Sequence, residues 1–281
     1  MRGLRRLGKS RGGALGMAGL VVSVSLALAA PLLPLSSPYA QDVTRRLLPP
    51  SWMPGGSLAH PLGTDPLGRD LLARIVFGGR VSLLVGVAAV GVAGSVGTVL
   101  GMVAGYYGRR VDLVVMRLAD IQLGFPFILL VITLMAVFGP GLGNVILALG
   151  IAGWTTYARV VRAEALSLRG REFVDGARAM GGSEWRILGR YILPNVLSPV
   201  LVIASFAMAS TIIVESSLSF LGLGVQPPVP TWGNILSDGR PYLGTAWWVA
   251  ALPGSAITAT VLSINLVGDW LRDLLDPRLR V

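Results

Sequence analysis

Long apolar runs alternate with short arginine-bearing segments along this chain. Six of the runs are long enough to cross a membrane, whose hydrocarbon core of roughly 30 Å requires about 20 residues of helix. A segment in lipid must satisfy its own backbone hydrogen bonds, so each run is expected to be an α-helix. The runs lie at about 14–35, 81–107, 113–138, 142–161, 196–220 and 246–268. The pattern predicts an all-α membrane protein with six transmembrane helices.

The composition supports this class and excludes several others. Hydrophobic residues make up 53% of the 281 residues, charged residues only 14%, and the mean hydropathy is +0.69. There is no cysteine and a single histidine, His60, so we expect no disulfide and no metal site in this chain. The net charge of +10 does not indicate nucleic-acid binding, because the basic residues sit between apolar runs, as in cytoplasmic loops of membrane proteins.

The distribution of arginine predicts the orientation. With a cytoplasmic N-terminus, the inner segments carry 18 basic residues and the outer segments six, so both termini are expected inside. The first run spans about 22 residues, longer than a secretory signal core of about 7–15 residues, and favours an uncleaved anchor. The predicted organisation is therefore a cytoplasmic tail at 1–13, an anchor at 14–35, an outer loop at 36–80 and a core at 81–281, with a cytoplasmic loop at 162–195.

A stripe of small residues marks the second run. Ala89, Ala93, Gly97, Gly101 and Gly105 recur every four residues and form one smooth helix face. Such a face lets another helix approach closely. We favour packing against a helix of the same chain, with a contact to another subunit as the alternative.

Ionisable residues within the predicted spans are candidates for function, since charges in a membrane are costly and usually paired. Arg117 and Asp120 share one helix face in the third span, which suggests a local ion pair or a role in gating or the solute path. Pro126 is expected to kink that helix. Glu215 is a lone acid near the outer end of the fifth span, either a proton or cation relay or a structural hydrogen-bond acceptor for a neighbouring loop.

The N-terminus contains a textual match to a phosphate-binding loop. Residues Gly3 to Ser10 read GLRRLGKS and satisfy G-x-x-x-x-G-K-[ST]. A working loop of this kind needs a preceding buried strand, and only Met1 and Arg2 precede Gly3. We interpret the segment as a basic flank of the first span at the lipid surface and expect no ATP or other cofactor on this chain.

The segment between the fourth and fifth spans is too polar to cross the membrane. Glu172 to Met180 predicts a helix with Phe173, Ala177 and Met180 on one face, ended by Gly181-Gly182. Ser183 then resembles an N-cap for a second helix that runs to Leu193, with Pro194 marking the return to the membrane. Such a helix–turn–helix suits docking onto another protein; a solvated loop on the lipid surface is the alternative.

This segment resembles the cytoplasmic signature of ABC importer permeases, E-A-A, three residues, G, nine residues, I-x-L-P. The spacing fits, with Asp for Glu, Gly for the first Ala and Tyr191 for Ile. In that family the segment is a coupling helix seated in a groove of the ATPase subunit. The resemblance implies that the coupling residues are Asp175, Gly176, Ala177, Gly181, Leu193 and Pro194.

Two further stretches narrow the resemblance. HPLGTDPLGRDLLARIVFGGRVSL at 60–83 and SSLSFLGLGVQPPVPTWGNIL at 216–236 are similar to hallmarks of the dipeptide/oligopeptide/nickel permeases, C-type subunit. The resemblance implies a type I importer fold in the bacterial cytoplasmic membrane, paired with a B-type permease, two ATPases that bind ATP and Mg²⁺, and an outer solute-binding protein. It implies transport of short peptides, with nickel complexes or other small solutes as alternatives. An ion-coupled secondary transporter is a further alternative.

The resemblance also suggests roles for the outer segments. Residues 60–80 and 222–242 are rich in proline and glycine, and we expect them to form ordered lids that meet the solute-binding protein.

Overall fold

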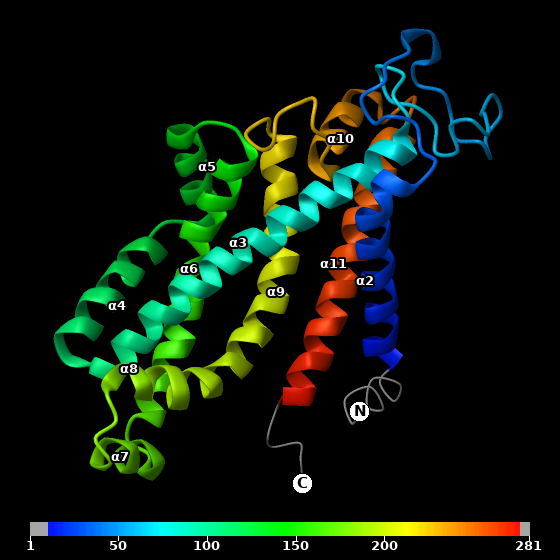
Figure 1. Cartoon of the computed structure of the whole chain (residues 1–281). Helices are drawn as coiled ribbons and strands as arrows, with labels where there is room; N and C mark the ends of the chain where they lie inside the picture. The colour runs from blue at the N-terminus through cyan, green and yellow to red at the C-terminus, as the bar shows by residue number, and fades with distance from the viewer. Residues whose placement is uncertain (1–10, 276–281) are drawn as a thin grey trace.

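The computed structural model describes residues 11–275, which fold almost entirely into helices (Figure 1). Apolar runs with few helix breakers form the long helices, and glycine or proline interrupts the chain between most of them. No strand is present between residues 11 and 275. The helices are α2 (Arg11–Ala29), α3 (Leu71–Tyr107), α4 (Arg109–Leu123), α5 (Phe127–Phe138), α6 (Leu142–Leu168), α7 (Glu172–Ala179), α8 (Glu184–Ile187), α9 (Leu193–Phe220), α10 (Trp232–Gly239) and α11 (Trp248–Leu275).

Five helical stretches are long and apolar enough to span a membrane, and a sixth span forms if α4 and α5 count as one. The GLRRLGKS match lies outside the described residues. The second span begins at Leu71 rather than at residue 81, because Asp70 caps the helix by accepting a hydrogen bond from the Ala73 N–H at 2.7 Å. The last residues of the predicted outer loop are therefore helical.

The third predicted span is broken rather than kinked. The axes of α4 and α5 differ by 92° across residues 124–126. Pro126 lacks an N–H and disfavours helical backbone at Phe125, so the first helix ends at Leu123 and α5 begins afresh at Phe127. The expectation of one continuous helix over 113–138 was wrong.

The small-residue stripe packs α3 directly against α6, which confirms the intrachain reading. A Cβ at Gly101 would lie 2.5 Å from the Ala158 carbonyl oxygen, and one at Gly105 would lie 2.6 Å from that of Arg162. The partner atoms belong to the backbone of α6 and cannot rotate away. In Figure 1, α3 crosses the molecule obliquely and meets α6 near its inner end.

Buried ion pairs hold the outer loop together. Asp65 is fully buried and accepts hydrogen bonds from Arg69 Nε at 2.6 Å and from Arg74. Asp238 of α10 accepts from the same two arginines, each at 3.0 Å. Since two carboxylates face two guanidinium groups, the cluster is neutral and joins the loop to α3 and α10. The role of the outer segments as lids that meet a solute-binding protein stays a prediction.

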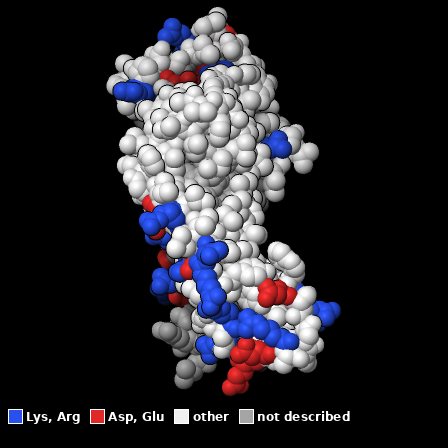
Figure 2. Space-filling model, turned by 90° about the vertical axis from the view of Figure 1, so that its left-hand side faces the viewer, with Lys and Arg blue, Asp and Glu red and all other residues white. Residues whose placement is uncertain are grey.

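The charged residues gather toward the two ends of the molecule. Figure 2 shows Lys, Arg, Asp and Glu at the top and bottom of one face, with an almost uncharged band between them. The inner ends of α2 and α11 lie at the same end of the molecule as α7 (Figure 1). A band of this kind is what a membrane-embedded surface requires.

Replacing Gly101 by valine is expected to destabilise the fold. The new side chain would overlap the α6 backbone, and overpacking of this kind costs about 1–3 kcal/mol or more. Gly91 is the matched control, because it lies on the same helix with no atom within 4 Å of its Cβ position. The thermal midpoint in detergent should fall for Gly101→Val and stay near wild type for Gly91→Val; equal midpoints would contradict the packing argument.

Asp65→Asn is expected to loosen the outer loop. It leaves two buried guanidinium groups with one carboxylate, and breaking a buried pair costs about 3–5 kcal/mol. Asp42→Asn is the control, since Asp42 forms an exposed pair with Arg45 at 3.2 Å. Limited proteolysis from the outer side should cut residues 36–70 faster only in Asp65→Asn. Unchanged cleavage would show that the cluster does not fasten the loop.

Candidate functional site

The chain between α6 and α9 forms a compact projection at the inner end of the molecule (Figure 1). Val174 and Ala177 of α7 are buried in one cluster with Ile187 of α8, Tyr106 of α3 and Val161 of α6. The projection is therefore packed onto the helix ends and is not a solvated loop. Burial of these apolar side chains contributes stability in proportion to the area removed from water.

The buried face of α7 differs from the predicted one. Of Phe173, Ala177 and Met180, only Ala177 is buried, because positions 174 and 177 turn toward the cluster instead. Phe173 and Met180 point outward, 44% and 80% exposed. The eight-residue helix is too short for its periodicity alone to fix which side packs inward.

Gly181 ends α7 as predicted. Its φ of +76° lies in the left-handed region that favours glycine, and the Gly182 N–H donates to the Ala177 carbonyl at 3.0 Å. A Cβ at Gly181 would meet no atom within 4 Å, so the requirement is conformational and not steric. Ser183 occupies the N-cap position of α8, but its side chain forms no capping hydrogen bond.

The second helix does not stop at Leu193. After α8 the chain makes one π-helical turn at Leu188–Ile192 and continues directly into α9, so Pro194 lies in the first turn of a membrane helix. The Leu193 N–H donates to the Leu188 carbonyl, five residues back. The wider π-helical turn accommodates the proline ring without interrupting the helix. Pro194 was predicted to mark a separate return of the chain to the membrane, but the helix continues through it into α9.

The structure places the six residues of the coupling signature in two environments. Asp175, Gly176 and Gly181 are exposed on the projection, while Ala177 is buried beneath them. Leu193 and Pro194 lie at its base, where it joins α9. Asp175 pairs with Arg178 at 2.9 Å, and the Arg178 guanidinium sits 5.3 Å from the centre of the Tyr106 ring on α3.

Three large apolar side chains are exposed on the projection: Phe173, Met180 and Trp185, which we call the tip face. Trp185 is 73% exposed. Large exposed apolar side chains on a polar projection make it a candidate surface for contact with another protein. Sequence reasoning missed Trp185; a tryptophan in the first turn of a polar helix was the available signal.

Arg117 and Asp120 do not form the predicted ion pair. Asp120 pairs instead with Arg159 of α6 at 2.6 Å, and Asp112 binds Arg162 of the same helix, with Nη2 at 2.5 Å. Gln122 adds a hydrogen bond from its amide to the Ala152 carbonyl at 2.8 Å. Asp112, Asp120 and Gln122 of α4 are therefore all paired with α6.

Glu215 is fully buried among hydroxyl groups. It accepts hydrogen bonds from Ser219 at 2.8 Å, from Ser82 of α3 at 3.0 Å and from Ser216 at 3.5 Å. The Trp232 N–H at the start of α10 in turn donates to Ser82 Oγ at 3.4 Å. The carboxylate therefore connects α9 with α3 and, through Ser82, with the start of α10. Its role in gating or transport stays a prediction.

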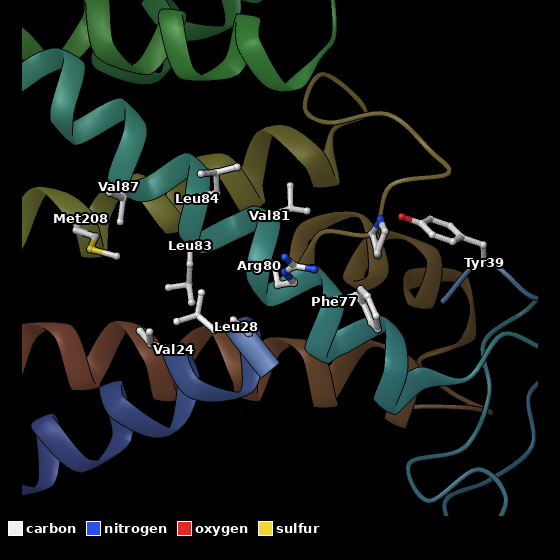
Figure 3. Close-up of a pocket in the computed structure, with 12 residues that line it drawn as sticks. Val24, Leu28, Tyr39, Phe77, Arg80, Val81, Leu83, Leu84, Val87 and Met208 are labelled. Carbon is white, nitrogen blue, oxygen red and sulfur yellow. The ribbon is translucent and has the colours of Figure 1, made fainter. Parts of the chain in front are cut away.

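A cavity of about 520 Å³ opens at the outer end between α2 and α3 (Figure 3). Its walls are mostly aliphatic, with Val24 and Leu28 from α2, Leu83 from α3 and Met208 from α9. Arg80 is its one charged lining residue. A lining of this kind suits hydrocarbon. Among the described residues, no group of His, Cys, Asp or Glu could hold a metal ion.

Comparisons with known proteins agree with these features. Residues 97–281 match the family described as binding-protein-dependent transport system inner membrane component. The chain is 42% identical to the di/tripeptide transport system permease protein DppC of Pseudomonas aeruginosa, over 95% of this chain and 89% of that protein. It is 40% identical to the dipeptide transport system permease protein DppC of Bacillus subtilis, over 98% of this chain and 85% of that protein.

A solved structure shares the fold. The inward-facing MetNI methionine ABC transporter contains a chain that matches with a TM-score of 0.58 at 19% identity, covering 73% of this chain and 98% of the other. The helices, their order and the inner projection therefore form the type I ABC importer permease fold. The chain belongs to the family of inner membrane components of binding-protein-dependent transport systems.

Proposed function

We propose that this permease imports short peptides through the bacterial cytoplasmic membrane, driven by ATP that other subunits hydrolyse. The substrate class is supported by relatives at 40–43% identity whose names specify dipeptide or di/tripeptide transport. The observation that carries the ATP-driven mechanism is the tip face, three exposed apolar side chains on a projection packed between the ends of two membrane helices.

We propose the partners from the surfaces at the two ends of the molecule. The projection offers its exposed face to an ATPase subunit, and two such subunits would bind ATP and Mg²⁺. The ordered outer loop and α10 offer a surface to a solute-binding protein. A B-type permease completes the path. If the projection and the inner ends of α2 and α11 face the cytoplasm, the arginine-rich segment 159–190 also lies inside, as expected for membrane proteins.

In this proposal the permease changes conformation in response to the ATPases and catalyses no covalent reaction itself. ATP can shift the permease between inward-open and outward-open states only if the ATPases contact the two states differently. We expect the ATPases to make these state-dependent contacts at the tip face. Because α7 and α8 pack on α3 and α6, a displacement of the projection moves those helices with it.

Co-purification and uptake test this proposal together. The permease, expressed with the partner genes of its host, should bring down a second permease and ATPase subunits, and proteoliposomes should accumulate a labelled dipeptide only with internal ATP. Trp185→Ala should weaken ATPase recovery, since a buried aromatic anchor contributes about 2 kcal/mol or more to an interface. Leu262→Ala, at an exposed position of α11, is the control. Uptake driven by a proton gradient without ATP would overturn the proposal.

Gly181→Asp is expected to uncouple transport. A non-glycine residue at this φ costs about 1–2 kcal/mol, and the turn that sets the angle between α7 and α8 would shift. Gly170→Asp introduces the same charge at an exposed position with an ordinary backbone and no neighbour within 4 Å. Peptide uptake in cells should fall sharply for Gly181→Asp alone. Normal uptake by that variant would show that the turn is not required for coupling.

A further inference from the structure

The cavity between the outer ends of α2 and α3, which we call the outer cavity, is polar at one end and apolar at the other. Tyr39 of the outer loop and Arg80 of α3 line its outer part, and Val24, Val87 and Met208 line its deeper part. Arg80 and Val87 lie about 10 Å apart along α3, since a helix rises about 1.5 Å per residue. Figure 3 shows Arg80 between the aliphatic side chains and Tyr39. The polarity of the lining therefore changes with depth, as it does along a phospholipid.

Arg80 has no counter-charge in the described part of the chain. Its side chain forms no ion pair or hydrogen bond with any residue from 11 to 275. The carboxylates of Asp65 and Asp238 are already bound by Arg74 in the buried cluster. A cation beside an apolar membrane cavity is costly unless an anion or water reaches it. Because Arg80 is exposed, its guanidinium is accessible to a group from outside the chain.

The two polar groups of the outer cavity suit a phosphodiester. A guanidinium carries five N–H donors in one plane and binds phosphate through two parallel hydrogen bonds. The Tyr39 hydroxyl has no partner among the described residues, and Figure 3 shows it directed back toward the cavity. A phenol can donate one further hydrogen bond to a phosphate or ester oxygen. Tyrosine is also typical of the boundary between hydrocarbon and headgroups.

The outer cavity is open along its side. Leu28, Leu84 and Val87 on its rim are 70%, 53% and 58% exposed. α2 lies at the edge of the bundle, on the side opposite α4 and α5 (Figure 1). A lipid can therefore enter sideways from the bilayer, with its headgroup at the level of the outer loop.

We propose that the outer cavity binds an anionic phospholipid of the outer leaflet, with one acyl chain between α2 and α3 and the phosphate on Arg80. An acyl chain that leaves the bilayer for this cavity exchanges one hydrocarbon environment for another, so its transfer contributes little to selectivity. Selectivity comes from the headgroup. Phosphatidylglycerol keeps a net negative charge, which complements the uncompensated Arg80, whereas the ammonium of phosphatidylcholine offsets its own phosphate. The inference does not depend on which solute is imported.

A photoreactive lipid tests the site directly. In the transporter co-purified with its partner subunits, phosphatidylglycerol with a diazirine on one acyl chain should crosslink to residues 24–28 of α2 and 83–87 of α3. Unlabelled phosphatidylglycerol should compete for these crosslinks about tenfold better than phosphatidylcholine with the same acyl chains, the effect of one charge-assisted hydrogen bond.

Two pairs of variants separate the headgroup contact from the acyl-chain contact. Arg80→Gln should lower the crosslink yield at these residues about tenfold. Arg46→Gln should not, because Arg46 is an exposed arginine of the outer loop that does not line the cavity. Val24→Trp should fill the cavity and abolish the crosslinks whatever the headgroup. Val22→Trp is its control, since Val22 is exposed on the same helix outside the cavity lining.

Three outcomes would overturn the inference. Equal competition by the two lipids would show an unselective boundary lipid. Unchanged crosslinking in Arg80→Gln would show that the guanidinium does not hold the headgroup. Crosslinks elsewhere on the transporter but none at residues 24–28 and 83–87 would show that a helix of the second permease covers the cavity. The competition between lipids uses the wild-type chain, so it decides the question even where a variant fails to assemble.

Discussion

The close contact of α3 with α6 is the constraint on which both ends of the molecule depend. Gly97, Gly101 and Gly105 let the two backbones meet, and no larger residue fits there without moving a carbonyl group. From this contact α3 extends outward to Asp70 and the buried ion cluster. At its inner end it supplies Tyr106 to the cluster under α7. Without a fixed crossing of these helices, neither end would be held relative to the other.

Membrane placement divides the polar residues into two groups. The first group is paired: Asp120 with Arg159, Asp65 with two arginines, and Glu215 with serine hydroxyls. Asp65 and Glu215 are fully buried, so their contacts offset the cost of removing polar groups from water, and all three sets of contacts fix segments to one another. The second group consists of buried polar atoms that have no hydrogen-bond partner among the described residues, such as the Tyr157 hydroxyl and Nε1 of Trp248.

Much of this architecture could be predicted from the sequence. The lengths of the apolar runs predicted the five continuous spans. The four-residue repeat of small residues predicted the packing face of α3. Both features depend on the local geometry of a helix. The turn at Gly181 followed from its need for positive φ. The break at residues 124–126 was underestimated as a kink, since a proline alone does not say how far the next helix turns.

Other features were beyond sequence reasoning because they depend on contacts distant along the chain. Asp120 finds Arg159 on α6, 39 positions away, and not Arg117 one turn earlier. The inward face of α7 is chosen by Ile187 and Tyr106, not by its own periodicity. The open cavity bounded by α3, α6 and α9 likewise required the fold, because its lining residues are distant along the chain.

The length of α3 has a mechanical meaning. Its 37 residues form an unbroken rod of about 55 Å. Near its outer end, Arg74 forms an ion pair with Asp238 of the outer cluster. At its inner end, the Tyr106 ring contacts the Arg178 guanidinium of the projection. The contact with α6 extends from Val92 to Gly105, over the inner half of this rod. Because α3 is continuous, a displacement at the projection would also move the outer ion cluster.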